Sequence, residues 1–409
     1  MKSIFNQADI LLPKKYVDHT RWTVIACDQF TSDPDFWDRV AKEVGECPST
    51  LHMILPEAWM GGRVDEAART REINQTMLRY LEEDLFEEFK DSLIYVERTL
   101  RNGKVRAGLV GAIDLEQYDV SPDSGSILRA TERIVASRLP ARVEIRRGAA
   151  LEIPHVLVLI DDPAGELIES IPRLGGLTKV YDFDLMENCG HVTGYRLTGA
   201  EAEQVAAAVS ALPILLVGDG NHSLVAAKMS WDEKKVGLTE AERLTHPARY
   251  ALVEINNVHE ESLKIEPIHR IVFDAPGDLL GAFVSAHPDV TLGSGEGYTI
   301  DYIDRGQRGA FTVSGRTVGE TIDLLQTFLD AYVTQHGGEI DYIHGDAELE
   351  ALAAKPGSIA FFMPQIEKSA LFESVIRGGV FPKKSFSMGE GADKRHYLEC
   401  KRIQPKTSI

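Results

Sequence analysis

The stretch Leu212-Pro-Ile-Leu-Leu-Val-Gly-Asp-Gly-Asn-His-Ser-Leu-Val-Ala-Ala-Lys228 decides the fold. Its apolar run, residues 214–217, predicts a short buried strand. Gly218 and Gly220 then break the pattern, because glycine tolerates a positive φ. From Asn221 onward the apolar residues recur at helical spacing. We therefore predict a strand, a glycine turn and a helix, which together form a concave site.

The predicted turn concentrates four polar side chains: Asp219, Asn221, His222 and Ser223. The first turn of a helix has backbone N–H groups without intrahelical partners and carries the positive end of the helix dipole, so it suits an anion, usually phosphate. The plainer interpretation, commoner for an arbitrary turn of this kind, is that Asp219 or Asn221 only caps the helix and that His222 is structural. An acid, an amide, an imidazole and a hydroxyl side by side favour a functional site.

The composition of the chain limits the classes of protein to which it can belong. The chain has 409 residues, of which 44% are hydrophobic and 26% charged, as expected of a globular protein with two or three domains. No run approaches the roughly 18 apolar residues of a membrane helix. The net charge of −19 argues against binding to nucleic acids or membrane surfaces. Four scattered cysteines without a C-x-x-C pair predict neither a zinc site nor disulfides, and they fit a reduced cytoplasm.

Strands and helices alternate along much of the chain, which predicts a mixed α/β fold with α+β character. Asn102-Gly103 predicts a hairpin. We further expect strands at residues 21–27 and 51–57 and helices at residues 64–89 and 127–139. Two domains are predicted: a main α/β domain at residues 1–258, which contains the Asp-Gly-Asn-His loop, and a second α/β domain at residues 259–409.

Candidate residues also lie outside the turn. Asp28 directly follows the predicted strand at residues 21–27, where α/β folds place ligands, although an aspartate there is equally common as a turn residue. Arg129 and Arg133 begin an arginine-rich segment that extends to Arg147. Such a segment can form the basic wall of an anion pocket or pair with surface acids, and both interpretations stay open. The tail, residues 381–402, is also rich in lysine and arginine.

Six stretches, taken in order, carry a family resemblance. They are Ala26-Cys-Asp-Gln-Phe-Thr-Ser-Asp-Pro-Asp-Phe-Trp37, Ser49-Thr-Leu-His-Met-Ile-Leu-Pro-Glu57, Leu128-Arg-Ala-Thr-Glu132, Gly218-Asp-Gly-Asn-His-Ser-Leu224, Ile265-Glu-Pro-Ile-His-Arg270 and Pro382-Lys-Lys-Ser385. Together they resemble the prokaryotic, bacterial-type family catalogued as domain of unknown function 1015 (DUF1015). The resemblance spans nearly the whole chain and implies no established reaction.

The family's usual signature is Asp-Gly-His-His-Arg, and the matching residues here are Asp219, Gly220, Asn221, His222 and Ser223. This motif is similar to the loop of the ParB/sulfiredoxin-like group, which includes free-serine kinases. In that group such a strand–turn–helix holds nucleotide phosphates at a helix start, so the resemblance implies a phosphate-binding fold of this type. Since serine replaces the usual arginine, the resemblance implies that the phosphate charge is met by helix amides, the serine hydroxyl and an arginine from elsewhere in the chain. The candidates for that arginine are Arg129 and Arg133.

The first functional hypothesis is a kinase-like, nucleotide-dependent phosphotransferase that acts on a small hydroxylated metabolite and uses ATP or ADP with Mg²⁺. Phosphoryl transfer needs a phosphate cradle, charge neutralisation and a base. His222 would donate to a phosphate oxygen, Asp219 would hold Mg²⁺ or orient the nucleophile, and Asp28 would be the base. The phosphate-binding residues of this hypothesis are Gly220, Asn221, Ser223, Arg129 and Arg133.

Two alternatives stay open. The same cradle without a base would make a non-catalytic regulatory protein that binds a nucleotide or metabolite. A metal-dependent hydrolase built on Asp219, His222, Asp28 and Glu254 ranks lowest, because the sequence has no compact metal-ligand spacing. In each case the expected partner is a small anionic or phosphorylated ligand, with no membrane or nucleic acid, and homo-oligomerisation stays open.

Overall fold

The computed structural model describes residues 3–31, 33–121, 124–153 and 156–406, apart from the side chains of residues 34 and 137. Residue contacts group the chain into two compact units. The first comprises Met1–Arg129, Val135–Leu263 and Glu390–Ile409, and the second comprises Ala130–Ile134 and Lys264–Gly389. This grouping differs from the predicted division at residue 258, because the last segment of the chain returns to the first unit. The predicted boundary itself stays a prediction.

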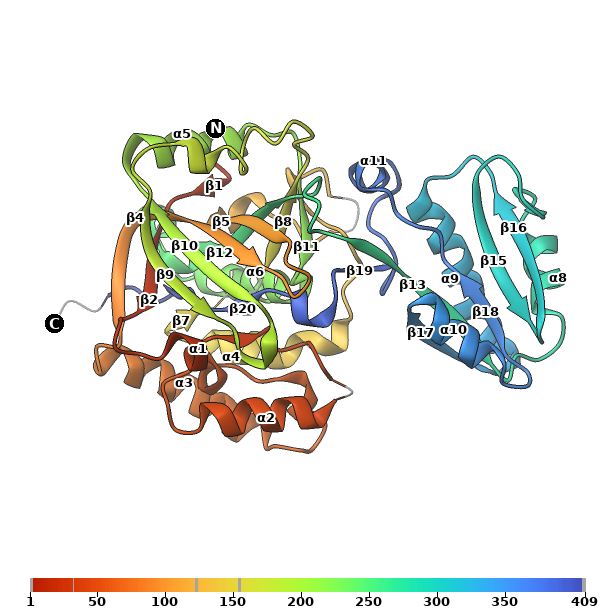
Figure 1. Ribbon diagram of the computed structural model, residues 1–409, viewed down its shortest axis with the longest axis horizontal. Helices are drawn as coiled ribbons and strands as arrows, with labels where there is room; N and C mark the ends of the chain where they lie inside the picture. Colours follow the sequence, from red (N-terminus) through yellow and green to blue (C-terminus); the bar gives the residue numbers. More distant parts are fainter. Residues whose placement is uncertain (1–2, 32, 122–123, 154–155, 407–409) are drawn as a thin grey trace. The chain divides into compact units, whose positions relative to one another are not determined.

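The first unit is built on a large mixed sheet (Figure 1). Its strands are β1 (Phe5–Asn6), β2 (Ala8–Pro13), β4 (Phe86–Thr99), β5 (Val105–Asp114), β6 (Leu128–Ala130), β8 (Leu157–Ile160), β9 (Thr178–Asp184), β10 (His191–Leu197), β11 (Leu215–Asp219) and β12 (Tyr250–Asn257). Within the described residues the order is β6-β11-β8-β12-β5-β4-β10-β9, while β1 pairs with β5 and β2 with β4. Strands β8 and β12 are parallel, whereas β11 runs antiparallel to β8 and β5 antiparallel to β12.

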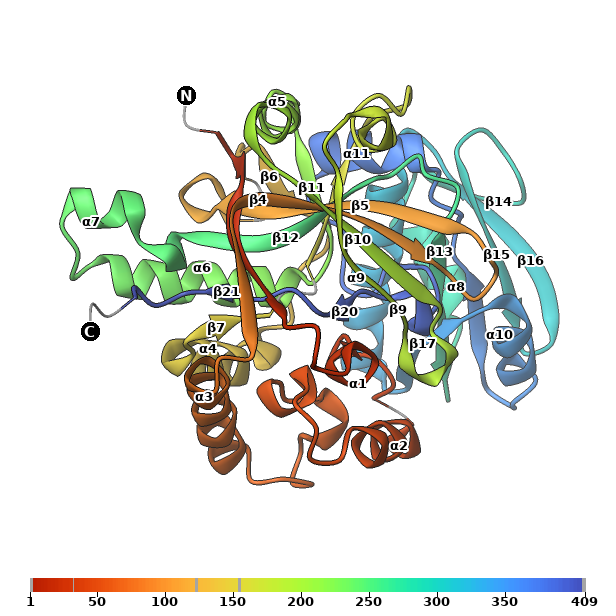
Figure 2. The same cartoon turned by 60° about the vertical axis from the view of Figure 1, so that its left-hand side comes forward.

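Helices cover both faces of this sheet. They are α1 (His19–Trp22), α2 (Pro34–Val44), α3 (Glu66–Glu82), α4 (Leu139–Gly148), α5 (Gly199–Ser210), α6 (Asn221–Lys235) and α7 (Glu240–Thr245). Helix α5 lies on one face, and α6, α4 and α3 follow one another on the other (Figure 2). The returning C-terminal segment contributes β20 (His396–Tyr397), which pairs with β3 (Val24–Ile25), and β21 (Lys401–Arg402), which pairs with β7 (Leu151–Glu152).

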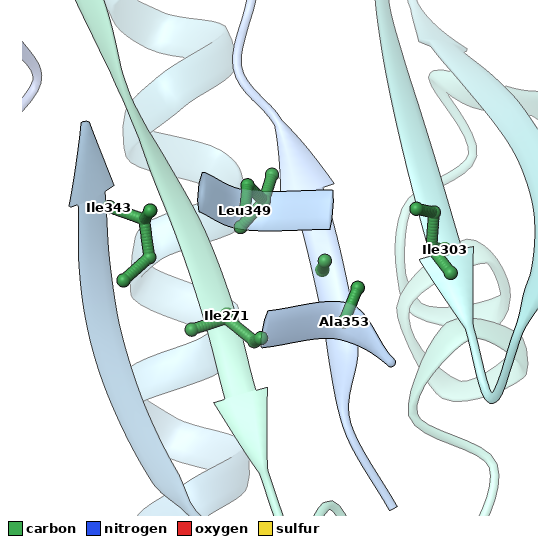
Figure 3. Packing of buried hydrophobic residues seen from close by; sticks show 6 residues of the cluster. Ile271, Ile303, Ile343, Leu349 and Ala353 are labelled. Atoms are coloured by element: carbon green, nitrogen blue, oxygen red, sulfur yellow. The ribbon is translucent and has the colours of Figure 1, made fainter. Parts of the chain in front are cut away.

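The second unit has its own sheet and core. Its strands are β13 (Ile265–Phe273), β14 (Val290–Leu292), β15 (Tyr298–Asp304), β16 (Gln307–Val313), β17 (Glu339–His344), β18 (Ile359–Phe362) and β19 (Phe386–Met388), and its helices are α8 (Leu279–Ala286), α9 (Val318–His336), α10 (Asp346–Ala353) and α11 (Lys368–Gly378). Within the described residues the order is β14-β16-β15-β18-β13-β17, with β19 paired to β13. Figure 3 shows part of the core, where Ile271 and Ile343 of the sheet pack with Leu349 and Ala353 of α10.

The mixed α/β fold and the central strand–turn–helix are confirmed. Strand β11 covers Leu215–Asp219, Gly220 has φ 77°, and α6 begins at Asn221. The predicted hairpin around residues 102–103 is confirmed too, because β4 and β5 pair on either side of it. These features depend on short-range signals, namely an apolar run, a glycine turn and helical spacing.

Two predicted elements are wrong, and two are present with shorter bounds than predicted. The helix expected at residues 64–89 ends at Glu82, and Phe86 already pairs with Pro13 as β4 pairs with β2. The helix expected at residues 127–139 is instead β6 and an irregular segment, since the Leu215 N–H donates to the Ile127 carbonyl. Residues 50–53 form a 3-10 helix rather than a strand, and the strand expected at residues 21–27 shrinks to β3. At residues 86–89 and 127–130, pairing with distant residues overrode the local pattern.

No helix among the described residues combines the length and apolarity needed to cross a membrane.

Candidate functional site

The turn between β11 and α6 is a tightly fixed feature of the first unit. Gly220 adopts a left-handed conformation (φ 77°, ψ 22°), and a Cβ added there would lie 2.9 Å from the Val156 Cα. Only glycine therefore fits at this position. Its N–H donates to Asp219 Oδ1 at 2.9 Å, so the chain itself already uses this amide. Because Gly220 is the N-cap of α6 and has no side chain, it covers none of the amides of the first helical turn.

His222 is held in one protonation state by its surroundings. Its Nε2 accepts a hydrogen bond from the Val135 N–H at 2.8 Å. Burial, aided by the positive charges of Arg142 and Arg138, lowers the pKa of His222 to about 4. The ring is therefore neutral at pH 7, and its one proton lies on Nδ1. This tautomer can donate a hydrogen bond to a ligand at the helix start.

Lys394 lies beside Asp219, and the sequence did not mark it as a site residue. Its Nζ is 3.3 Å from Asp219 Oδ2, and its side chain is only 9% exposed. A buried ammonium needs a compensating partner, which Asp219 supplies. The only signal in the sequence was that the tail is basic, and nothing there distinguished Lys394 from its lysine neighbours.

Two buried arginines fix the backbone that carries Lys394. Arg98 on β4 lies directly opposite Arg106 on β5. Arg98 donates to the carbonyls of Ala392 (2.8 Å) and Lys394, and Arg106 donates to the carbonyl of Asp393 (2.8 Å). Burial, followed by the facing charge of Arg106, lowers the pKa of Arg98 to about 9. Three successive carbonyls are thus anchored to the main sheet, and this anchoring sets the position of Lys394.

Asp28 is also brought to this neighbourhood. It follows Cys27 just after β3, and Gln29 Nε2 donates to its Oδ1 at 3.0 Å. Its negative charge opposes the lowering of the His222 pKa, so the two side chains lie within electrostatic reach of each other. Of the predicted site residues outside the turn, Asp28 is thus within electrostatic reach of His222, and its role as a site residue stays a prediction.

The two predicted phosphate arginines each have a partner within the chain. Arg129 is on β6, next to β11 in the sheet, and its Nε donates to the Ser126 carbonyl at 3.0 Å. Arg133 belongs to the second unit, where its Nη1 lies 3.0 Å from Asp323 Oδ1. Their phosphate-binding role stays a prediction.

The arginines whose charge reaches His222 come later in the same arginine-rich segment. Both pair with Glu57: Arg138 Nη1 lies 3.4 Å from Glu57 Oε2, and Arg142 donates to Oε1. Two arginines of this segment thus act electrostatically on His222, and whether the segment forms the basic wall of an anion pocket stays a prediction.

Asn221 and Ser223, the remaining polar residues of the turn, have different contacts. Asn221 Nδ2 lies 3.4 Å from the Val217 carbonyl, which ties the helix start back to β11. Ser223 lines a cavity of about 130 Å³ between α6, α4 and the segment around Ile54. In the part of the chain that the structure describes, no group of three or more His, Cys, Asp and Glu side chains is arranged to hold a metal ion.

Comparisons with solved structures give distant likenesses. A free serine kinase in complex with AMP has 12% sequence identity over 71% of this chain and 91% of that chain, with a TM-score of 0.41. A conserved hypothetical protein from Pyrococcus furiosus has 14% identity over 70% and 93%, and SbnI with a C-terminal truncation from Staphylococcus aureus has 10% over 72% and 86%; both have TM-scores of 0.38.

No curated protein matches the chain. A family model described as a protein of unknown function (DUF1015) matches residues 10–330. This match includes the turn at Gly220 and the segments around Asp28 and Arg142, and it confirms the resemblance found in the sequence. The chain belongs to the DUF1015 family of proteins of unknown function.

Proposed function

We propose that this protein binds the phosphate groups of a nucleotide at the start of α6 and transfers the terminal phosphoryl group to a hydroxyl of a small metabolite. One observation carries this proposal. A neutral His222 with its proton on Nδ1, the nearly buried Lys394 ammonium and the glycine-capped start of α6 converge on one turn. Each of these groups can donate hydrogen bonds to phosphate oxygens.

The proposed cradle combines a fixed backbone with one charged side chain, Lys394. The positive end of the dipole of α6, a helix of 15 residues, favours a phosphate group near Gly220. Lys394 has three N–H donors, so it can keep Asp219 and still donate to a phosphate oxygen. The Ser223 hydroxyl supplies a further donor in place of the arginine found in the usual signature.

Asp28 is proposed as the base of the transfer step. It would take the proton of the acceptor hydroxyl, whose oxygen then forms a bond to the terminal phosphorus. The bond between that phosphorus and the bridging oxygen breaks, and the nucleotide leaves with the electron pair. Lys394 and the helix amides would neutralise the charge on the transferring group.

The contacts of the Asp219 carboxylate limit its use as a Mg²⁺ ligand. Mg²⁺ takes oxygen ligands and commonly binds substrate phosphates together with one or two carboxylates. Asp219 uses Oδ1 for the Gly220 N–H and Oδ2 for Lys394. A metal ion on this carboxylate would therefore compete with the positive charge of the lysine. We propose that Asp219 orients Lys394 and that the nucleotide's own phosphate oxygens provide most of the Mg²⁺ ligands.

The first test is nucleotide binding measured by isothermal titration with ATP, ADP and CTP, with and without Mg²⁺. The variant Lys394→Met should weaken binding about 10- to 150-fold, because a hydrogen bond to a charged group contributes ~1.5–3 kcal/mol. Lys401→Met is the matched control, since Lys401 is another buried lysine of the same tail whose Nζ faces Glu152 at 3.8 Å. Failure of the wild-type protein to bind any of the three nucleotides would eliminate the proposal.

The second test separates an enzyme from a binding protein. Phosphorus NMR of wild-type protein with ATP or ADP and a mixture of hydroxylated metabolites should show a new phosphomonoester signal. Asp28→Asn should abolish that signal while nucleotide affinity changes less than about threefold, because the base acts on the acceptor. If wild-type protein binds the nucleotide but never transfers phosphate, the non-catalytic regulatory function replaces the proposed one.

We also propose a cytoplasmic location. The cysteines of the chain, Cys27, Cys47, Cys189 and Cys400, are all free thiols, and proteins of oxidising compartments commonly use disulfides instead. Fractionation of cells that express the protein at its natural level would check this location, and recovery from an oxidising compartment would contradict it.

A further inference from the structure

A cavity of about 130 Å³ opens beside the first two turns of α6. Helices α4 and α6 and the segment around Ile54 surround it, and Ser223 and Ala226 form its α6 wall. Its lining is mainly aliphatic and includes Met53, Ile54, Leu55, Met77 and Ile145. The cavity therefore favours an apolar occupant.

The charged groups of this cavity are already paired with one another. Arg142 donates to Glu57, and Arg146 donates to Glu152. A paired arginine and glutamate present little net charge to an occupant. The cavity thus offers an apolar interior with a balanced polar rim, in contrast to the polar turn beside it.

Its size limits what can enter. An apolar cavity of roughly 150 Å³ accepts one benzene molecule, whereas sites for drug-sized ligands are roughly 300–1,000 Å³. The cavity of about 130 Å³ therefore admits one ring or one branched aliphatic group. A complete nucleoside is larger than this enclosed space and would extend out of it.

The position of the cavity identifies which reactant it serves. Ser223 belongs both to the first turn of α6 and to the cavity wall. A group in the cavity would therefore lie next to the phosphate that the turn holds. In a nucleotide the base is separated from the terminal phosphate by the ribose and the other phosphates, so the base cannot lie there while the terminal phosphate occupies the turn.

The acceptor, in contrast, can place a group in the cavity next to this phosphate, because its hydroxyl must approach the terminal phosphorus. Cys27 also lines the cavity, and Asp28, the proposed base, follows it directly in the chain. We infer that the acceptor is a hydroxylated compound with one small apolar group, a single ring or a branched aliphatic chain, which this cavity binds. This inference rests on the proposed phosphotransferase function and narrows its substrate class.

The cavity can be filled without touching the turn. Ala141 on α4 is half-buried and lines the cavity, so Ala141→Leu places a side chain in the space of the ring. Ala208→Leu on α5 is the matched control, because Ala208 is also a half-buried helical alanine of the first unit but does not line the cavity. Melting temperatures of both variants report whether each protein folds.

The binding probes are 2-phenylethanol, which carries a hydroxyl and one ring, and glycerol, which carries hydroxyls only. Saturation-transfer NMR of each alcohol is measured with saturating ADP, and ADP affinity is measured separately by titration. Wild-type protein and Ala208→Leu should bind 2-phenylethanol at least tenfold more tightly than glycerol. Ala141→Leu should lose this preference at least tenfold while still binding ADP.

The outcomes separate the inference from the function on which it rests. Equal binding of both alcohols by wild-type protein, or an unchanged preference in Ala141→Leu, overturns the inference while ADP binding leaves the proposed function intact. Loss of ADP binding in folded Ala141→Leu also overturns it, because the cavity then holds the nucleotide. Absence of ADP binding by wild-type protein defeats the proposed function, and with it the assignment of the cavity to an acceptor.

Discussion

Gly220 in the first unit and Gly345 in the second each join a strand directly to a helix, and the two turns differ in the charge at the helix start. In the first unit Gly220 joins β11 to α6, whose first turn has no acidic residue. In the second unit Gly345 joins β17 to α10, whose first turn contains Asp346 and Glu348. Carboxylates at a helix N-terminus interact favourably with the dipole and occupy the place of an anion. The first helical turn of α10 therefore carries its own anions, whereas that of α6 does not; the carboxylate next to it, Asp219, precedes the N-cap and faces Lys394.

One histidine in each unit, His269 in the second and His222 in the first, can be compared in the same way. His269 accepts from the Met363 N–H through Nδ1 at 3.0 Å, and its Nε2 lies 2.8 Å from Asp346 Oδ1. The protein thus uses both of its nitrogens. His222 uses Nε2 for a backbone N–H and keeps its proton on Nδ1. Similar local geometry therefore serves structure in one unit and, we propose, ligand binding in the other.

Ser223→Asp would make the α6 turn resemble the α10 turn, and it is the prediction with the largest effect. The added carboxylate should weaken nucleotide affinity at least 100-fold, because like charges in contact cost several kcal/mol. It should also stabilise the fold by about 0.3–1 kcal/mol through the helix dipole. Titration calorimetry and urea denaturation measure the two effects.

The control for this charge is Ser223→Asn, which has a similar shape without the charge. It should lose less than about tenfold in affinity, since it removes one neutral hydrogen bond of ~0.5–1.5 kcal/mol. Equal affinities of the two variants would show that no anion rests at the start of α6.

Gly220→Ala tests how firmly the α6 turn is fixed. A left-handed alanine costs roughly 1–2 kcal/mol, and the contact of its Cβ with Val156 should add ~1–3 kcal/mol. Gly103→Ala is the matched control, because Gly103 has φ 78° and a Cβ there meets nothing within 4 Å. Urea denaturation should therefore show a larger loss of stability for Gly220→Ala. Equal losses would mean that Val156 does not constrain the turn.

The α6 turn could be predicted from the sequence because its signals are local. An apolar run, two glycines and helical spacing lie within residues 214–227, and the structure confirms all three. Asp28 came from the general rule that ligands lie beyond strand ends, and the structure brings it near His222. However, the strand behind that prediction is only Val24–Ile25 and pairs with β20 rather than with the main sheet.

Contacts between distant parts of the chain could not be predicted. Lys394 reaches Asp219 only because Arg98 and Arg106 anchor the returning C-terminal segment. The arginine-rich segment was recognised, but the local pattern did not indicate that Arg138 and Arg142 are the residues whose charge lowers the pKa of His222. Such choices depend on strand pairing and packing, for which one sequence gives no local signal.

The pH dependence of stability tests the environment of His222. Its folded pKa of about 4 lies below the ordinary value of 6.5, so the unfolded chain takes up this proton first as the pH falls. The stabilisation is therefore complete above pH 6.5 and is lost progressively towards pH 4. After allowance for solvent screening of this half-buried ring, the loss should be about 1–2 kcal/mol.

His222→Gln removes this titration, so its free energy of unfolding should fall less than that of wild-type protein between pH 6.5 and pH 4. Urea denaturation at several pH values gives both curves, and other titrating groups contribute equally to each. Parallel curves would contradict the assignment of a neutral ring. Because the ring titrates far below pH 7, protonation of His222 should not change nucleotide affinity between pH 7.5 and pH 6.

Asp346→Asn in the second unit should have the smallest effect. The Asp346 side chain is 78% exposed, and such a pair contributes only ~0–1 kcal/mol. Burial already lowers the pKa of His269, and Asp346 opposes this lowering, so the pKa should fall further in the variant, as proton NMR would show. Nucleotide affinity should not change, because the α10 turn is occupied by the chain's own carboxylates. A tenfold loss of affinity in this variant would instead mean that the α10 turn takes part in binding, and the contrast between the two helix starts would no longer explain where the ligand lies.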